Sequence, residues 1–250
     1  MGDKVIPVKV AVRVRPLVPK EVAEGCQLAL EVVDGEPQVF VPNTEKAFTY
    51  DYAFAGNSTN EEVYRNAVKD MVGRLFEGYN VTVLAYGQTG SGKTHSMGTA
   101  YKADTSQEME GVIPRAVRDI FEAMKEKDFE FKVTVSFIEL YNEQLFDLLS
   151  SKARKEDAMV DIREDGKGGI KIPGLTEAPV GCLEATMGLL ERSSEGRVTA
   201  ATAMNKVSSR SHAIFTLTVE SKPGPSCANQ AVTVSKVGKA TVTLFCVLFC

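Results

Sequence analysis

The chain has 250 residues, of which 44% are hydrophobic and 25% charged, and its formal net charge is −4 at pH 7. These values are ordinary for a soluble globular protein and allow a sizeable core in one or two domains. The acidic balance excludes a mainly electrostatic nucleic-acid binder. The five cysteines have no metal-ligand spacing, which favours reduced thiols in the cytosol. No apolar run reaches the roughly 20 residues that span a bilayer.

Apolar periodicity then predicts the elements in chain order. Strands are expected at 8–14, 28–33, 38–41, 48–54, 129–141 and 213–219. Helices are expected from Thr59 or Asn60 to about Gly78, from Pro114 onward, and over 143–149 and 183–190. The aromatic stripe in FTYDYAF (48–54) is interpreted as core, and 99–111 as a surface loop. Small hairpins are expected around Asp34-Gly35 and between 160–162 and 170–172.

Residues 81–98, VTVLAYGQTGSGKTHSMG, join a β-branched apolar run to a glycine-rich loop. The loop fits the pattern G-x-x-x-x-G-K-[ST] of a P-loop. Glycines let backbone N–H groups approach phosphate oxygens, the lysine supplies charge for the β- and γ-phosphates, and the threonine hydroxyl can ligate Mg²⁺. We therefore predict a site for ATP or GTP with Mg²⁺, instead of a purely structural turn. Its residues are Gly87, Gln88, Thr89, Gly90, Ser91, Gly92, Lys93 and Thr94.

A second polar pattern, NKVSSRSH at 205–212, precedes the strand expected at 213–219. Taken alone, four polar residues before a strand are typical of a solvated loop. Beside a P-loop they acquire another interpretation, because phosphoryl transfer needs an element that senses the γ-phosphate. Serine hydroxyls can bind a phosphate oxygen or a water, and an arginine can clamp charge.

Together, GQTGSGKTHSMG (87–98) and NKVSSRSH (205–212) resemble the P-loop and switch I of the kinesin motor domain. Further matches are RVRP (13–16), FTYDYAF (48–54), GVIPRA (111–116) and SFIELYNEQLFDLL (136–149). The resemblance covers roughly residues 8–221 and is greatest to the chromokinesin branch. It implies an α/β fold with a mostly parallel central sheet flanked by helices on both faces.

The resemblance also implies an ATP-driven microtubule motor of the cytoplasm and cytoskeleton, with the spindle or nucleus as further locations for a chromokinesin. Under it, Arg13, Arg15, Pro16 and His95 flank the adenine. Thr94 and Ser209 serve Mg²⁺. The catalytic group comprises Lys93, Ser208, Ser209 and Arg210. His95 alternatively is an ordinary helix residue, and the two arginines alternatively mark a solvated strand end. Oligomeric state and cargo do not follow from the sequence.

The resemblance fails after Glu220, so a family domain at 1–221 and a divergent tail at 222–250 are expected. The family's switch II, D-x-x-G-x-E, should follow, but no Asp or Glu occurs after Glu220. The tail ends in TVTLFCVLFC, interpreted either as a replacement strand or, preferentially, as an unrelated ending that exposes a β-prone segment. The family's main microtubule-binding helices would lie beyond switch II. Basic residues near its minor contact loop are Arg163, Lys167 and Lys171.

Three functions therefore remain open. The first is a kinesin motor segment whose ATP turnover is impaired because the switch II acids are missing. The second is a nucleotide-binding or interaction module without motor activity. The third is an unrelated P-loop kinase or nucleotidyl transferase that uses Glu139, the only strand-borne acidic candidate upstream of the tail.

Overall fold

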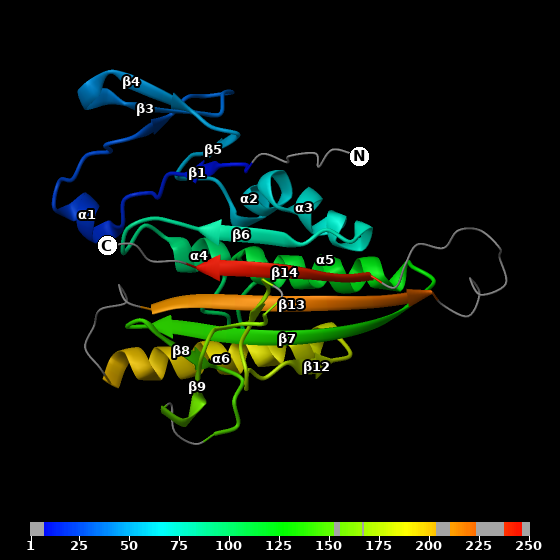
Figure 1. Cartoon of the computed structure of the whole chain (residues 1–250). Helices are drawn as coiled ribbons and strands as arrows, with labels where there is room; N and C mark the ends of the chain where they lie inside the picture. The colour runs from blue at the N-terminus through cyan, green and yellow to red at the C-terminus, as the bar shows by residue number, and fades with distance from the viewer. Residues whose placement is uncertain (1–7, 153–155, 167, 204–210, 224–237, 247–250) are drawn as a thin grey trace. The chain divides into compact units, whose positions relative to one another are not determined.

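The structure is a computed structural model that describes the chain except for residues 1–7, 153–155, 167, 204–210, 224–237 and 247–250. The chain forms two compact units, Met1–Ala67 and Val68–Cys250. Figure 1 shows the elements of both units.

The first unit contains a parallel pair of strands and an antiparallel three-stranded sheet. Its elements are β1 (Ala11–Arg13), α1 (Pro19–Ala23), β2 (Glu31–Val32), β3 (Gln38–Val41), η1 (Pro42–Thr44), β4 (Lys46–Thr49), β5 (Tyr52–Phe54) and α2 (Asn60–Ala67). Strand β1 pairs with β5, and β3 lies between β2 and β4. The hairpin predicted around Asp34-Gly35 is confirmed by the β2–β3 pairing.

The aromatic stripe at 48–54 is not a single core strand, which corrects the prediction. The backbone leaves the three-stranded sheet after Thr49 and joins β1 from Tyr52 onward. As a result Phe54 is buried at 7% exposure, whereas Phe48 is 47% exposed. Two strands in different sheets place alternate residues on unrelated faces, so period alone does not identify the core.

Helix α2 begins as the sequence predicts. The Thr59 hydroxyl accepts the backbone N–H of Glu62 at 3.1 Å, and the Glu62 carboxylate accepts the N–H of Thr59 at 2.7 Å. This reciprocal pair is a capping box, which satisfies two backbone donors at the helix start.

The second unit contains a mixed sheet and the remaining helices. Its helices are α3 (Lys69–Gly73), η2 (Arg74–Glu77), α4 (Lys93–Met97), α5 (Val112–Lys125), η3 (Glu156–Ala158) and α6 (Leu183–Ala203). Its strands are β6 (Val81–Ala85), β7 (Phe129–Tyr141), β8 (Gln144–Asp147), β9 (Met159–Val160), β10 (Arg163–Glu164), β11 (Ile170–Lys171), β12 (Ala178–Val180), β13 (Ser211–Pro223) and β14 (Gly238–Cys246). No helix among the described residues is long and apolar enough to cross a membrane.

The large sheet runs β6-β14-β13-β7-β8-β9, with β12 also paired to β7. Only the β6–β14 pair is parallel among its described pairs, so the expected mostly parallel sheet is wrong in this detail. The α/β class itself is confirmed. The sheet is mostly antiparallel for two reasons. Strands β7 and β8 are joined by a tight turn, which reverses the chain, and β13 runs antiparallel to both of its neighbours, β14 and β7. The arrows of β6, β14 and β7 point one way and that of β13 the other (Figure 1).

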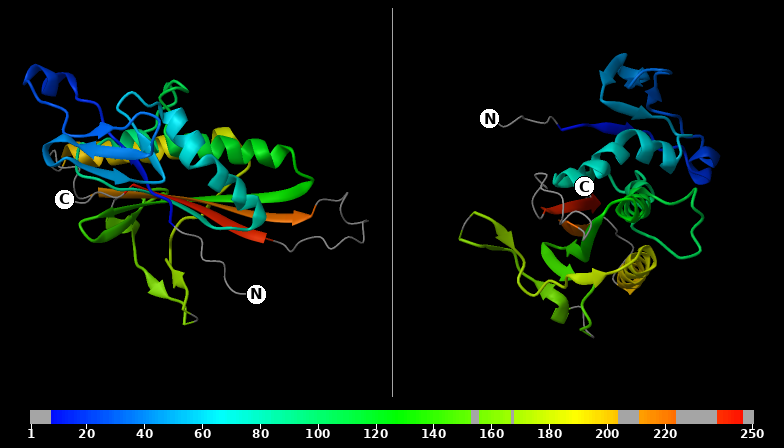
Figure 2. Two further views of the ribbon diagram at one scale, coloured as in Figure 1. Left: turned by 90° about the horizontal axis from the view of Figure 1, so that it is seen from above. Right: turned by 90° about the vertical axis from the view of Figure 1, so that its right-hand side faces the viewer.

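The described helices α5 and α6 contact each other and lie along one face of the sheet (Figure 2). Burial along β13 alternates accordingly. Ala213, Phe215 and Leu217 are buried at 0–1% exposure, while Ile214 and Thr216 between them are only half-buried. The rings of Phe137 and Phe215 meet edge to face, 5.6 Å apart, in the covered layer.

The predicted helix at 143–149 is instead strand β8, which pairs with the end of β7. Asn142 and Glu143 between them both have positive φ, 49° and 65°. Two successive left-handed residues form the type I′ turn whose twist suits a two-residue hairpin. Pairing with β7 therefore overrides the local helical spacing.

The hydrophobic tail forms β14, a central strand hydrogen-bonded to β13 on one side and β6 on the other. The replacement-strand alternative thus describes its placement, and the preferred alternative of an exposed segment is wrong. Segments on both sides of residue 221 belong to one compact unit. The proposed family boundary at 221 stays a prediction.

Candidate nucleotide-binding site

The P-loop begins where β6 leaves the sheet. Gly87, Gly90 and Gly92 have φ of 152°, 81° and 93°, and Gly92 is the N-cap residue directly before helix α4. L-residues rarely adopt these angles, so the loop needs glycine at these positions. A Cβ at Gly87 would lie 2.7 Å from the Ser91 hydroxyl, whereas a Cβ at Gly90 would meet nothing within 4 Å. The loop backbone therefore packs against the Ser91 side chain at Gly87, whereas the space beside Gly90 is empty. A loop of backbone N–H groups that binds an anion needs such a space.

The Lys93 side chain lies inside the loop and contacts it at three positions. Its side chain is 7% exposed, and its ammonium donates to the carbonyl oxygens of Gly87 and Gln88, both at 2.5 Å. It also lies 3.4 Å from the Ser91 hydroxyl. The predicted lysine is thus brought to the centre of the loop, within reach of any phosphate bound there.

Thr94 and His95 follow on the first turn of α4, and both are exposed. An exposed hydroxyl beside the loop is a suitable Mg²⁺ ligand, because Mg²⁺ is commonly held by few protein oxygens together with phosphates and water. In the described part of the chain, no cluster of three or more His, Cys, Asp or Glu could hold a metal by itself. The residues present therefore fit a cation bound jointly with a nucleotide.

Three strands end at the edge of the sheet that carries the P-loop. Ala85 of β6 is aligned with Cys246 of β14, and Ala213 of β13 is aligned with both Cys246 and Glu139 of β7. Because ligands bind outside the carboxyl ends of strands in open α/β sheets, this edge is the expected nucleotide side. Ser208, Ser209 and Arg210 lie outside the described residues, but β13 begins at this edge with the next residue, Ser211.

Arg13 lies in the first unit and is held by α2 and the turn before it. It donates to Asn60 Oδ1 at 2.6 Å and to the Ser58 carbonyl at 2.7 Å. Burial lowers the pKa of its guanidinium, and the charge of Glu62 opposes this shift. The alternative of a solvated strand end does not describe Arg13, which is half-buried.

Arg15 forms a two-pronged ion pair with Glu21 on α1, at 2.7 and 3.0 Å. The hydrogen bond from Arg15 lowers the pKa of the Glu21 carboxyl, and the same bond raises the pKa of Arg15. Pro16 next to it lies against Gly56, where an added Cβ would approach at 3.3 Å. The residues of RVRP thus contact α1, α2 and the segment before α2 within the first unit. The expected contact of RVRP with adenine stays a prediction.

The loop at 99–111 contains structure that the sequence did not predict. A Cβ on Gly111 would lie 2.2 Å from the Gly98 nitrogen, so the two ends of the loop meet at this pair of glycines. Glu110 is 4% exposed and accepts Arg118 of α5 at 2.7 and 2.8 Å. The sequence feature that could have indicated this structure is the motif GVIPRA at 111–116, whose glycine directly follows Glu110.

The P-loop nucleotide-binding class is defined by a strand, a glycine-rich loop that contains a lysine, and a helix that follows. This chain has all three, and its lysine is buried inside the loop. Within it, the kinesin motor domain family model matches residues 13–240, and the chain belongs to this family. The unrelated P-loop kinase or nucleotidyl transferase is therefore excluded.

Among curated relatives, the chain is 53% identical over 221 residues to chromosome-associated kinesin KIF4A of Homo sapiens, a match covering 88% of this chain and 18% of the relative. It is 51% identical over 222 residues to chromosome-associated kinesin KIF4 of Gallus gallus, with the same coverage. The predicted chromokinesin resemblance is confirmed. A solved structure described as a fast kinesin, with implications for ATPase mechanism and interactions with microtubules, matches with a TM-score of 0.84 and 30% identity over 96% of this chain and 65% of that one. The chain thus spans less than a fifth of these curated relatives' length.

Proposed function

We propose that this chain binds ATP with Mg²⁺ as the nucleotide-binding segment of a kinesin motor, and that its own turnover is impaired. The observation that carries the proposal is the loop at 87–94. Three of its glycines have positive φ, and the carbonyl oxygens of Gly87 and Gln88 accept the buried ammonium of Lys93. When bound, ATP supplies the phosphoryl group that is transferred to water. Lys93 neutralises the phosphates, Thr94 and Ser209 hold Mg²⁺, and Ser208 and Arg210 place the attacking water.

The proposed loss of turnover rests on the end of β14. This strand runs parallel to β6, so the chain leaves it at the P-loop edge after Cys246. P-loop NTPases take an acidic Mg²⁺ anchor from a strand end there. The residues that follow are Val, Leu, Phe and Cys, which carry no carboxylate. The same feature supports the second candidate, a nucleotide-binding interaction module without motor activity.

Two measurements test the proposal. We expect a fluorescent ATP analogue to bind the purified chain with micromolar affinity. Microtubule-stimulated phosphate release should be about 100-fold or more below that of a kinesin motor domain carrying switch II, because one electrostatic group of an active site contributes about that factor. Turnover equal to the complete motor domain would disprove the impairment, and absence of nucleotide binding would disprove the whole proposal.

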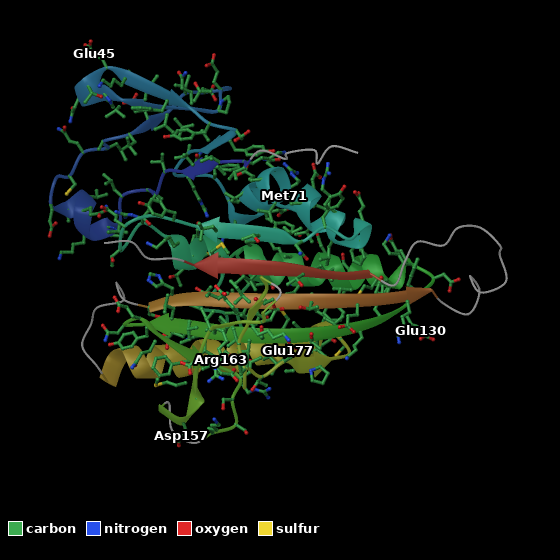
Figure 3. The ribbon with its side chains drawn as sticks, in the orientation of Figure 1. Glu45, Met71, Glu130, Asp157, Arg163 and Glu177 are labelled. Atoms are coloured by element: carbon green, nitrogen blue, oxygen red, sulfur yellow. The ribbon has the colours of Figure 1, made fainter. Side chains whose placement is uncertain are left out.

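A microtubule contact is proposed at the β10–β11 hairpin. Arg163 and Lys171 are direct cross-strand partners and both are exposed; Figure 3 labels Arg163. Like charges directly opposite each other destabilise a hairpin, which supports a role in binding an acidic surface. Ile170 beside them is 73% exposed. Lys167 lies outside the described residues.

Reversing both charges, Arg163→Glu with Lys171→Glu, should lower co-sedimentation with microtubules several-fold at low salt, with the difference shrinking as salt rises. The double variant Lys20→Glu with Lys46→Glu, at two exposed lysines of the first unit, changes the net charge by the same amount. It is the matched control and should change co-sedimentation little. An equal loss in both variants would show that only net charge matters and would remove the hairpin as a contact.

A further inference from the structure

Helix α4, which carries Lys93 and Thr94, is anchored at the end opposite the P-loop. It has only five residues. A helix this short depends on packing, because isolated helices below about 12 residues are marginal in water. Its end is buried, with Met97 and Thr99 both 2% exposed. Gly98 ends the helix at a φ of 75° and donates its N–H to the Thr94 carbonyl at 2.9 Å. The position of Thr94 therefore depends on what holds Gly98 and Thr99.

Helices α5 and α6 both contact this end of α4. Gly111, the N-cap residue of α5, lies so close that an added Cβ would be 2.2 Å from the Gly98 nitrogen. From α6, the hydroxyl of the buried residue Ser194 donates to the Thr99 carbonyl oxygen at 2.9 Å. This bond joins residues 95 apart in the chain. The end of the P-loop helix is thus restrained by packing from α5 and by a hydrogen bond from α6.

The neighbouring residue Ser193 provides a comparison for this bond. Both serines are 3% exposed. Ser193 donates to the Leu189 carbonyl at 2.9 Å, and Ser194 lies 2.7 Å from the Leu190 carbonyl. A bond to the carbonyl four residues earlier satisfies a serine hydroxyl within its own helix. Within the described part of the chain, Ser194 also donates to Thr99, and Ser193 has no such second acceptor. The hydroxyl of Ser194 therefore does more than satisfy its own hydrogen-bonding need.

We propose that Ser194 is a positioning residue of the nucleotide site. Its hydroxyl holds the Thr99 carbonyl and, through α4, fixes where Lys93 and Thr94 meet the phosphates. At 1.5 Å per residue the helix is only about 7 Å long, so a shift at its end reaches the P-loop. Without the bond, the arrangement that binds nucleotide is populated less, and the apparent affinity falls by the same fraction. This inference rests on the proposed function, because it concerns the same site.

The experiment measures the affinity of a fluorescent ATP analogue with Mg²⁺, at a temperature where circular dichroism shows every variant folded. Ser194→Ala should weaken binding about threefold to tenfold, the range that corresponds to the loss of one hydrogen bond. Ser194→Thr keeps the hydroxyl and should retain most of the affinity. The buried Thr99 hydroxyl has no hydrogen-bond partner among the described residues. Thr99→Val therefore removes no bond, keeps the carbonyl, and should bind as wild type does.

Ser193→Ala is the matched control, because it removes a hydroxyl of equal burial from the same helix. We expect it to lower the melting temperature as Ser194→Ala does and to leave the affinity unchanged. If wild type binds and the two alanine variants bind equally well, the inference is overturned alone. A loss in Thr99→Val as large as that in Ser194→Ala would overturn it too, because the side chain would then matter instead of the carbonyl. If the wild-type chain does not bind the analogue, the proposed function fails as well.

Discussion

Replacing Lys93 with alanine is expected to weaken ATP binding by about 100-fold or more. The variant removes the only charged side chain of the loop at 87–94. Two charge-assisted hydrogen bonds to phosphate, at about 1.5 kcal/mol each, give a loss of about 3 kcal/mol, which is a factor of roughly 100. Titration with a fluorescent ATP analogue measures the loss, and circular dichroism reports whether the fold persists.

Two further variants make this measurement specific. Lys102→Ala removes an exposed lysine from the loop that follows α4, and its affinity should equal that of wild type. Lys93→Arg keeps the charge, but a guanidinium is larger and planar, and the native side chain is only 7% exposed. We therefore expect the arginine variant to bind poorly too. Affinity within about threefold of wild type in Lys93→Ala would mean that the loop does not bind phosphate, since a tenfold change corresponds to about 1.4 kcal/mol.

Features set by local physics could be predicted from the sequence. The glycine positions of the P-loop follow from the need for unusual φ angles and close backbone approach. The strand β7 was predicted with its observed bounds, 129–141, because its apolar run is long. The capping residues Thr59 and Glu62 lie three residues apart and interact within one turn. In each case the property that decides the local structure is contained in a short stretch of sequence.

Features set by distant contacts could not be predicted. Whether a strand is parallel depends on its neighbours in the sheet, and β14 pairs with β6 at residues more than 150 positions away, as the bond from Thr241 N–H to Asn80 Oδ1 shows. The helix expected at 143–149 failed because the turn at Asn142 and Glu143 returns the chain to β7. Similarly, Glu139 could be identified as a candidate, but its hydrogen bond with the Ser211 hydroxyl depends on strand register.

The tail provides the second large expected effect. Val242→Pro should destabilise the Val68–Cys250 unit by about 3 kcal/mol or more, because proline removes a backbone N–H from a strand that has a neighbour on each side. Val242 is paired with Leu217 of β13 and with Val81 of β6. Urea denaturation followed by circular dichroism gives the change in the free energy of unfolding.

The control for this variant is Ser151→Pro, in an exposed loop of the same unit, which should cost less than about 1 kcal/mol. If Val242→Pro lowers the free energy of unfolding equally little, the tail does not occupy the sheet in solution, and the exposed-segment interpretation returns.

A large loss of stability in Val242→Pro has a consequence for the nucleotide site. Strand β14 separates β6, which leads into the P-loop, from β13, which begins at Ser211. A tail that lacks the family's acidic residues would then still supply the strand that holds the two phosphate-sensing segments at one edge.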